Sequence, residues 1–327
     1  MDGSLSQRLA AGLADPAIGI PEQALLTLTD RLRALGYSFI TPTPAAHRKV
    51  ISRFTRRERG NLRDIFGWNL RFSERDLDPD LLALMEAAGI VERKGSRLKS
   101  RLRLASLGDH LFWHSAFPAK EEDAVFFGPD TYRYAELIRS ELPSLGPNAR
   151  MVDIGAGSGA GGLVAGALAP QAEVILADIN PRALRLARLN AVIAGIPVQI
   201  TLSDGLAGVT GPIDLAMANP PYLGGGVGRT YRDGGGILGA GLSLAWAKAS
   251  AERLVPGGTL ILYTGSAIVR GGKDRVLAAL RDICAAGRCS LRYRELDPDV
   301  FSGMLAHPAY WHVERIAAVG AVVVKQG

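Results

Sequence analysis

The stretch Met151-Val-Asp-Ile-Gly-Ala-Gly-Ser-Gly159 places an apolar run directly before three closely spaced glycines. Glycines at a strand-to-helix turn let the backbone approach a ligand closely, and the helix that follows offers free N–H groups. The segment after these glycines is rich in alanine, glycine and leucine. We therefore predict a β-strand over residues 150–154, a ligand-binding turn, and a helix over residues 160–169.

Apolar strands and amphipathic helices continue to alternate after this turn. Further strands are predicted near residues 174–178, 198–201, 213–218 and 259–263, with helices near residues 181–194 and 242–254. Strands that alternate with helices of roughly 10–15 residues imply a parallel sheet wound by right-handed crossovers. The sequence predicts an α/β, Rossmann-like domain over residues 121–327, with a smaller, mainly helical N-terminal domain over residues 1–120.

The N-terminal part has its own pattern and most of the excess charge. Residues 24–35 and 80–89 have helical periodicity, and residues 97–105 alternate basic and apolar side chains as a half-buried strand does. Helix, short strand, turn and strand form the outline of a winged helix. Of the net charge of +6, a net +5 lies in residues 1–115, concentrated in residues 48–63 and 93–103. Such stretches either follow a phosphate backbone or form a solvated surface.

Composition limits the class of protein. The hydrophobic content of 47% and charged content of 21% are typical of a globular protein with a normal core. No apolar run approaches the length of about 18 residues that a membrane span needs, and the N-terminus lacks a secretory pattern. The only cysteines, Cys284 and Cys289, and five scattered histidines have no metal-ligand spacing. We expect a cytoplasmic protein without a bound metal.

The glycine turn alone is compatible with two cofactors. Gly157, Gly159 and Gly162 satisfy the dinucleotide pattern of an NAD-dependent oxidoreductase. However, Asp153 precedes the turn, where a carboxylate would repel a pyrophosphate but would suit a ligand that carries a sulfonium and an ammonium group. We therefore expect S-adenosylmethionine rather than NAD.

Acidic residues also end the next two predicted strands. Asp178 follows the second strand about twenty residues after the glycines, where its carboxylate can accept both ribose hydroxyls of a nucleoside. Asp204 follows the third strand and is placed to take the adenine amino group. Either residue by itself could be a loop or cap residue, but three acids at successive strand ends favour a nucleoside site.

The fourth strand ends in Asn219-Pro220-Pro221-Tyr222. Amide and exocyclic amine nitrogens are poor nucleophiles, because the lone pair is delocalised into the adjoining π system. The Asn219 side-chain carbonyl and the Pro220 backbone carbonyl can accept the two N–H groups of such an acceptor. Proline makes the turn rigid, and Tyr222 can pack flat against the planar acceptor. The segment therefore predicts methylation of a planar nitrogen.

Together these residues resemble the class I methyltransferases with an NPPY motif, especially the HemK/PrmC-like glutamine methyltransferases of the methyltransferase small domain family. The likeness covers roughly residues 126–325 and includes Gly128-Pro-Asp-Thr131, Asp233-Gly-Gly235 and the turn Leu254-Val-Pro-Gly-Gly258. It implies a seven-stranded sheet whose last strand is antiparallel, with residues 290–295 and 318–325 as strands six and seven.

The resemblance also assigns the site. Residues assigned to S-adenosylmethionine are Asp153, Gly155, Gly157, Gly159, Asp178, Ile179, Asp204, Gly205 and Asn219. Residues assigned to the acceptor and catalysis are Asn219, Pro220, Pro221 and Tyr222.

The acceptor itself is left open by the sequence. Protein glutamine is the first choice, a nucleobase amine of rRNA or tRNA (adenine N6 or guanine N2) the second, and a small molecule the third, because all present a similar planar NH₂ group. The basic N-terminal region favours RNA or docking of a protein such as a translation factor. The glycine-rich residues 224–241 could form a lid over the acceptor through Arg229, Tyr231 or Arg232, and Tyr310 and Trp311 could line the acceptor side or belong to the core.

Overall fold

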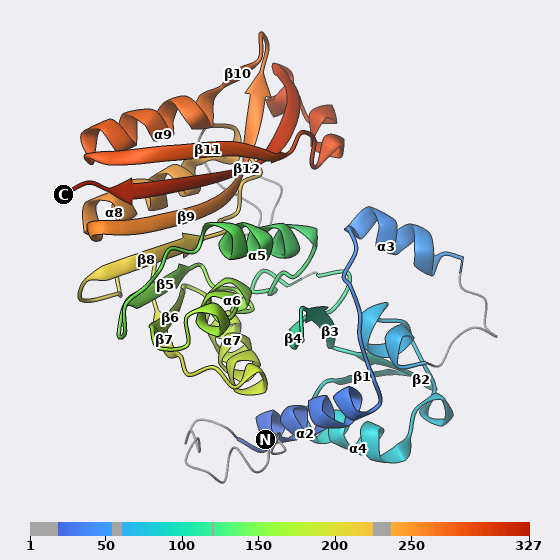
Figure 1. Cartoon of the computed structure of the whole chain (residues 1–327). Coiled ribbons are helices and arrows are strands. Elements are labelled where there is room, and N and C mark those ends of the chain that lie inside the picture. The colour runs from blue at the N-terminus through green and yellow to red at the C-terminus, as the bar shows by residue number, and fades with distance from the viewer. Residues whose placement is uncertain (1–18, 54–60, 120, 225–236) are drawn as a thin grey trace. The chain divides into compact units, whose positions relative to one another are not determined.

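The computed structural model describes residues 19–53, 61–119, 121–224 and 237–327. The chain forms two compact units, which we describe separately (Figure 1). Unit 1 comprises Met1–Pro129 with Arg188–Gly195, and unit 2 comprises Asp130–Ala187 with Ile196–Gly327. The units divide at residues 129 and 130, whereas the sequence placed the domain division at residues 120 and 121.

The described residues of unit 1 form three complete α-helices, the last residues of helix α7 (Pro181–Ala194) and two β-hairpins. The helices are α2 (Ile20–Ala34), α3 (Pro44–Ile51) and α4 (Pro79–Ala87), and short helical turns span Arg63–Gly67 (η2) and Glu74–Asp76 (η3). The hairpins are β1 (Val91–Lys94) with β2 (Arg97–Ser100), and β3 (Leu102–Leu107) with β4 (His110–Ser115).

One prediction for this unit was wrong in detail. The single strand expected over residues 97–105 is two strands, β2 and β3, which belong to different sheets. The chain changes direction at Arg101, and the Ser100 hydroxyl donates a hydrogen bond to the Leu102 carbonyl at 2.6 Å. A local side-chain bond of this kind competes with strand pairing, and alternation of side chains does not reveal it.

Unit 2 is built on a central sheet with the strand order β7–β6–β5–β8–β9–β12–β11 (Figure 1). The strands are β5 (Arg150–Ile154), β6 (Glu173–Asp178), β7 (Gln199–Leu202), β8 (Ile213–Ala218), β9 (Leu254–Val269), β11 (Cys289–Asp297) and β12 (Val313–Lys325). Strands β7, β6, β5, β8 and β9 are parallel, whereas β12 runs antiparallel to both β9 and β11. The predicted Rossmann-like sheet with an antiparallel last strand is confirmed.

Helices precede, connect and cover these strands. They are α5 (Pro129–Glu141), α6 (Ala160–Leu168), α7 (Pro181–Ala194), α8 (Gly241–Arg253) and α9 (Arg275–Ala286). A buried apolar cluster joins β5 and β9 to α8 and α9, with Val152, Leu260, Ala247 and Leu280 among its members. Parallel strands need apolar cover on their faces, and this cluster supplies it on one of them.

Strand β9 is much longer than the predicted residues 259–263. It pairs with β12 from Thr259 to Val269, and its last residues also pair with the short strand β10 (Lys273–Asp274). The extension therefore depends on a partner strand more than forty residues away in the sequence, which local propensity does not report. It carries Tyr263 and Gly265 beyond the apolar centre of the sheet toward the candidate site.

Candidate active site

Strand register brings the predicted cofactor and acceptor residues to one row at the carboxyl edge of the sheet. Four residues on adjacent strands pair with one another: Ala177, Ile154, Ala218 and Leu262. The residues that follow them are Asp178, Gly155, Asn219 and Tyr263. Ligands of open α/β sheets bind outside the carboxyl ends of the strands. The motifs that the sequence presents separately therefore lie along a single edge of the central sheet.

The glycine loop after β5 adopts a backbone that requires glycine. Gly155, Gly157 and Gly159 have φ values of +67°, +56° and +81°, which L side chains rarely adopt. The N–H groups of Gly155 and Ala156 both donate to the Ala177 carbonyl, at 2.8 and 3.0 Å. The loop is thus fastened to the end of β6, beside Asp178.

Asp178 is joined to the same loop by its side chain. Its Oδ2 accepts a hydrogen bond from the Gly157 N–H at 2.8 Å, and its Oδ1 accepts one from the Asn180 N–H at 2.8 Å. Burial raises the pKa of this carboxyl, and the backbone hydrogen bonds act in the opposite direction. A carboxylate offers about four acceptor positions, so Asp178 keeps acceptor capacity for a ribose hydroxyl. The next residue, Ile179, is 62% exposed and offers apolar surface to an adenine face.

Asp153 lies in the interior behind the loop. It is 1% exposed, and its carboxylate accepts hydrogen bonds from the Tyr134 hydroxyl at 2.9 Å and the Gly162 N–H at 2.7 Å. Burial raises the pKa of Asp153 to about 7. The structure therefore places its first partners in α5 and α6, and its contact with the positive groups of a cofactor stays a prediction.

Trp246 of α8 packs against two of the predicted cofactor turns. A Cβ atom on Gly155 would lie 2.5 Å from the Trp246 ring atom Cη2, and one on Gly205 would lie 3.0 Å from its Nε1. Sequence reasoning explained these glycines by the approach of a ligand, whereas the structure adds an internal reason. Asp204, on the same turn as Gly205, is exposed, and its contact with adenine stays a prediction.

The turn after β8 presents Asn219 and buries Tyr222. Asn219 is half-buried, and its carboxamide makes no hydrogen bond within the described part of the chain. Pro220 is buried and Pro221 is half-buried. Tyr222 is 7% exposed, and its ring lies edge-on to the rings of Tyr263 and Phe301, with centroids 6.3 and 5.8 Å away.

The Tyr222 ring packs against strand β9 in the interior. A Cβ atom on Gly265 would lie 2.1 Å from the Tyr222 ring, so the ring occupies the space that this glycine leaves. Its hydroxyl lies near Asp130 and Tyr263 but has no hydrogen-bond partner of good geometry among the described residues. In this structure the ring supports the turn from the interior, and stacking on an acceptor stays a prediction.

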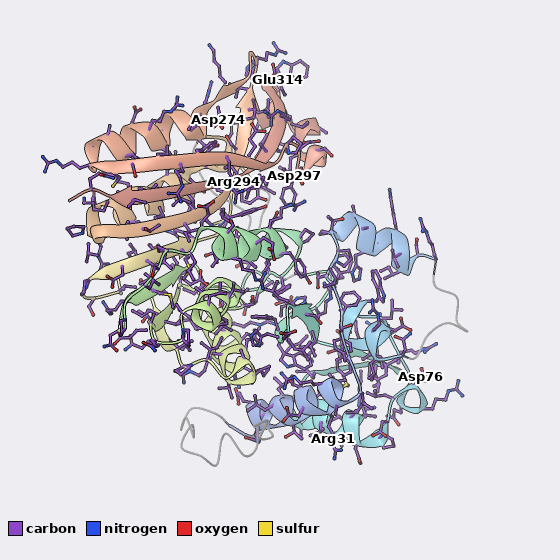
Figure 2. All side chains as sticks on the ribbon, viewed as in Figure 1. Arg31, Asp76, Asp274, Arg294, Asp297 and Glu314 are labelled. Atoms are coloured by element: carbon purple, nitrogen blue, oxygen red, sulfur yellow. The ribbon has the colours of Figure 1, made fainter. Side chains whose placement is uncertain are left out.

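A buried polar cluster lies beneath this turn and was not foreseen as part of the site. The Asp130 carboxylate, 6% exposed, accepts a hydrogen bond from the Tyr263 hydroxyl at 2.8 Å. Arg133 contacts Asp130 at 3.4 Å and Asp297 at 2.7 Å. Figure 2 labels Asp297, which ends β11. Burial raises the pKa of Asp130, and the Tyr263 hydrogen bond opposes that shift. Helix α5 thus supports the acceptor turn through Asp130 and the glycine loop through Tyr134.

The other candidate residues differ in exposure, and some lie outside the described residues. Tyr310 is buried and Trp311 is 73% exposed. Arg229, Tyr231 and Arg232, and the stretch at residues 233–235, lie outside the described residues. Within the described ranges, no three His, Cys, Asp or Glu side chains are grouped as metal ligands, and no helix is long and apolar enough to cross a membrane.

Comparison with known proteins agrees with this arrangement. The methyltransferase small domain family matches residues 122–267. A release factor glutamine methyltransferase of Bradyrhizobium diazoefficiens is 32% identical over 217 residues, which are 61% of this chain and 72% of the relative. The chain belongs to the HemK-like class I methyltransferases.

Two other relatives of this HemK-like methyltransferase match over shorter stretches. A release factor glutamine methyltransferase of Deinococcus radiodurans is 34% identical over 148 residues, which are 45% of this chain and about half of the relative (51%). A ribosomal RNA small subunit methyltransferase C of Pseudomonas entomophila is 30% identical over 130 residues, which are 40% of this chain and 36% of the relative.

The methyl donor of this family is S-adenosylmethionine, and the residues of the edge fit it. Asp178 retains acceptor positions beside the glycine loop, and Ile179 exposes apolar surface next to it. The donor would supply an electrophilic methyl group when bound. The protein would hold its ribose through Asp178, and Asn219, on the next strand to the glycine loop, would face the acceptor.

Proposed function

We propose that this HemK-like methyltransferase transfers a methyl group to the side-chain amide nitrogen of a glutamine in a protein substrate of the release factor type. The observation that carries the proposal is the pairing of Ile154 with Ala218, because it sets Asn219 beside the first residue of the glycine loop. Donor and acceptor would therefore meet across two neighbouring strands.

The reaction requires the protein mainly to orient the acceptor. The Asn219 carboxamide oxygen accepts one N–H of the planar amide and the Pro220 carbonyl accepts the other, which turns the nitrogen lone pair toward the methyl group. The carbon–sulfur bond of the donor breaks as the carbon–nitrogen bond forms, and the nitrogen then releases a proton to solvent. The methylated nitrogen is acidic, so no strong general base is needed. Such orientation contributes up to several kcal/mol.

Protein glutamine is favoured over the alternatives by the relatives. Release factor glutamine methyltransferases match over up to 72% of their own length in the two relatives described, whereas the ribosomal RNA methyltransferase matches over 36%. A nucleobase amine remains the second candidate, since that relative is 30% identical to this chain over 130 residues and guanine N2 or adenine N6 presents a similar NH₂ group. A small-molecule acceptor is the third.

We also propose that unit 1 contacts the macromolecular acceptor through basic side chains. Arg48, Lys49 and Arg53 are exposed at the end of α3 and just after it. The second basic stretch is less available, because Arg93 pairs with Glu74 at 2.7 Å and also with Glu86. Exchange of Arg48 and Lys49 for glutamate should raise the KM for the acceptor and leave cofactor affinity unchanged. An unchanged KM would remove α3 from the acceptor contact.

The test is methyl transfer from tritium-labelled S-adenosylmethionine into a cell extract, with protein and RNA fractions counted separately. The wild-type protein and Asn219→Ala are compared, each with its cofactor affinity measured. Label in protein that disappears with the variant supports the proposal. Label in RNA moves the acceptor to a nucleobase, and label in neither fraction despite cofactor binding contradicts both macromolecular acceptors.

A further inference from the structure

Tyr310 reaches the acceptor turn from a distant part of the sequence. The residue lies in a short helical turn, Pro308–Tyr310 (η6), between β11 and β12, and is 1% exposed. Its hydroxyl accepts a hydrogen bond from the Gly224 N–H at 2.7 Å and donates one to the Leu238 carbonyl at 3.5 Å. Gly224 follows the acceptor residue Tyr222 by two positions, so one hydroxyl contacts the end of the acceptor turn.

The two backbone segments that Tyr310 joins also touch each other. A Cβ atom on Gly224 would lie 2.8 Å from the Gly239 nitrogen, and one on Gly239 would lie 2.4 Å from the Tyr222 carbonyl oxygen. The chain therefore leaves the acceptor turn at Gly224 and returns at Gly239 in direct contact with it. Neither position has room for a side chain, so the contact is between backbones.

The returning segment is conformationally strained. Leu238 has φ +52° and ψ +36°, a left-handed conformation that is costly for a branched side chain. Such a conformation persists only where the surroundings impose it. The Tyr310 hydroxyl donates to the carbonyl of this residue, and Gly224 approaches Gly239 directly after it.

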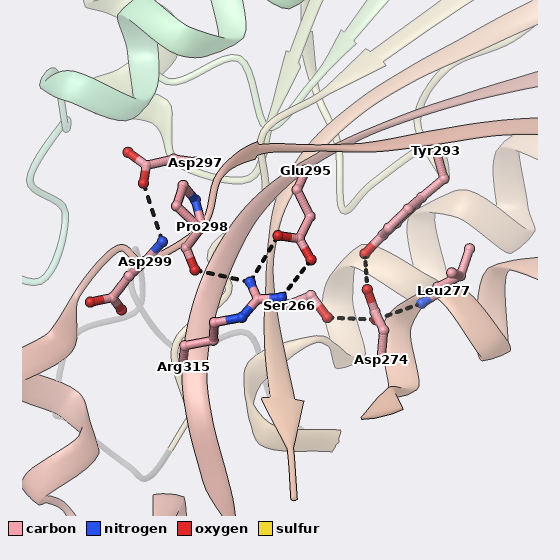
Figure 3. Close-up of polar contacts among 9 residues, drawn as sticks. All are labelled: Ser266, Asp274, Leu277, Tyr293, Glu295, Asp297, Pro298, Asp299 and Arg315. Atoms are coloured by element: carbon pink, nitrogen blue, oxygen red, sulfur yellow. Dashed lines mark hydrogen bonds and ion pairs between the residues drawn. The ribbon is translucent and has the colours of Figure 1, made fainter. Parts of the chain in front are cut away.

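The segment that carries Tyr310 is itself held firmly. Arg315 of β12 donates to both carboxylate oxygens of Glu295 at 2.8 Å and to the Pro298 carbonyl at 3.0 Å (Figure 3). The Val300 N–H donates to the Ile316 carbonyl at 2.7 Å. These contacts fix the start of the segment that carries Tyr310, at the point where the chain leaves β11.

We propose that Tyr310 is a positioning residue for the acceptor turn. Its hydroxyl fixes the backbone after Tyr222 and thereby the orientation in which Asn219 and Pro220 present their carbonyl groups. The inference rests on the proposed methyl transfer, since it assigns Tyr310 a part in holding the acceptor. It predicts that loss of the Tyr310 hydroxyl lowers kcat and leaves the affinity for the cofactor unchanged.

The experiment compares Tyr310→Phe with Tyr293→Phe in the full chain. Tyr293 also donates through its hydroxyl, to Asp274 at 2.6 Å (Figure 3). Among the described residues it makes no hydrogen bond to Tyr222, Gly224 or Leu238. Loss of a hydrogen bond that orients the acceptor should lower kcat roughly tenfold. Tyr293→Phe should keep kcat close to wild type at a similar loss of thermal stability, and cofactor Kd should be unchanged in both.

A second readout does not depend on the acceptor. Hydrogen exchange of the backbone amides at residues 222–224 should become faster in Tyr310→Phe and remain slow in Tyr293→Phe, because the Gly224 N–H loses its partner. If exchange is faster in Tyr310→Phe but the wild-type protein does not methylate the proposed glutamine acceptor, the acceptor is disproved and the positioning role of Tyr310 is supported. Unchanged exchange, or a wild-type kcat in Tyr310→Phe, would overturn the inference.

Discussion

The Tyr134 hydroxyl donates a hydrogen bond to the Asp153 carboxylate at 2.9 Å, so the helix before the sheet holds the acid that precedes the glycine loop. The Gly162 N–H of α6 holds the other oxygen of the same carboxylate at 2.7 Å. Asp153 thus joins two helices beneath the loop that we assign to the cofactor. Its charge state is set by burial, which raises its pKa to about 7.

We predict that the affinity for S-adenosylmethionine rises as pH increases through about 7, because Asp153 then becomes an anion that attracts the positively charged donor. Tyr134→Phe removes a hydrogen bond that lowers this pKa, so the midpoint should move to higher pH. Calorimetric titration of the protein with S-adenosylmethionine at several pH values measures this midpoint. S-adenosylhomocysteine lacks the sulfonium charge and should show a weaker dependence. An unmoved midpoint in Tyr134→Phe would show that Asp153 does not act on the cofactor.

Asp178 should matter more for cofactor affinity than Asp204 does. Asp178→Asn replaces an acceptor oxygen by an NH₂ group that faces the N–H of Gly157 or Asn180, and it weakens the ribose contacts. Affinity should fall roughly tenfold to a hundredfold, as for hydrogen bonds to a charged group. Asp204→Asn, at an exposed position on the same edge, should cost less. Titration of both variants checks the order, and a larger loss at Asp204 would reverse the assignment.

The contact between Gly155 and Trp246 can be tested by stability alone. Gly155→Ala and Gly157→Ala both place alanine at a positive φ, which costs about 1–2 kcal/mol. Only the Gly155 variant also drives a Cβ atom into the Trp246 ring, which adds about 1–3 kcal/mol. Denaturant unfolding should therefore find Gly155→Ala the less stable of the two. Trp246→Leu should remove most of that difference, and equal stabilities of the two alanine variants would refute the packing.

The two tyrosines beneath the acceptor turn should respond differently to loss of the hydroxyl. Tyr263→Phe leaves the buried Asp130 carboxylate without its 2.8 Å donor and should cost about 1–3 kcal/mol of the free energy of unfolding. Tyr222→Phe removes a buried hydroxyl without a well-placed partner and should change this free energy by less than about 1 kcal/mol. Chemical unfolding of both variants measures the contrast, which would vanish if Tyr222 were the true donor to Asp130.

Much of the sheet could be predicted because each strand is recognisable from its local sequence. Apolar runs such as residues 213–218 are bounded by turn residues, and the glycines near residue 155 mark a strand-to-helix turn. Asp178, Gly155 and Asn219 each directly follow a predicted parallel strand, and the carboxyl ends of such strands meet at one edge of the sheet. Local pattern was therefore enough to place the cofactor and acceptor motifs on one edge.

The supports of that edge could not be predicted, because they join residues far apart in the sequence. Trp246 looks like any apolar residue of an amphipathic helix, and only the structure sets its ring between Gly155 and Gly205. Tyr310 is separated from Gly224 by 86 positions. Tyr222, predicted to pack flat against the acceptor, is buried because β9 extends to Gly265, an extension that depends on pairing with β12.

The central claim is that this chain methylates a glutamine amide held by Asn219. Purified protein, a purified release factor and S-adenosylmethionine should give one methylated peptide, and mass-spectrometric fragmentation should place the methyl group on a glutamine side chain. At a saturating concentration of the donor, Asn219→Ala should leave that peptide unmodified. A methyl group on another residue, or equal methylation by Asn219→Ala, would contradict the account.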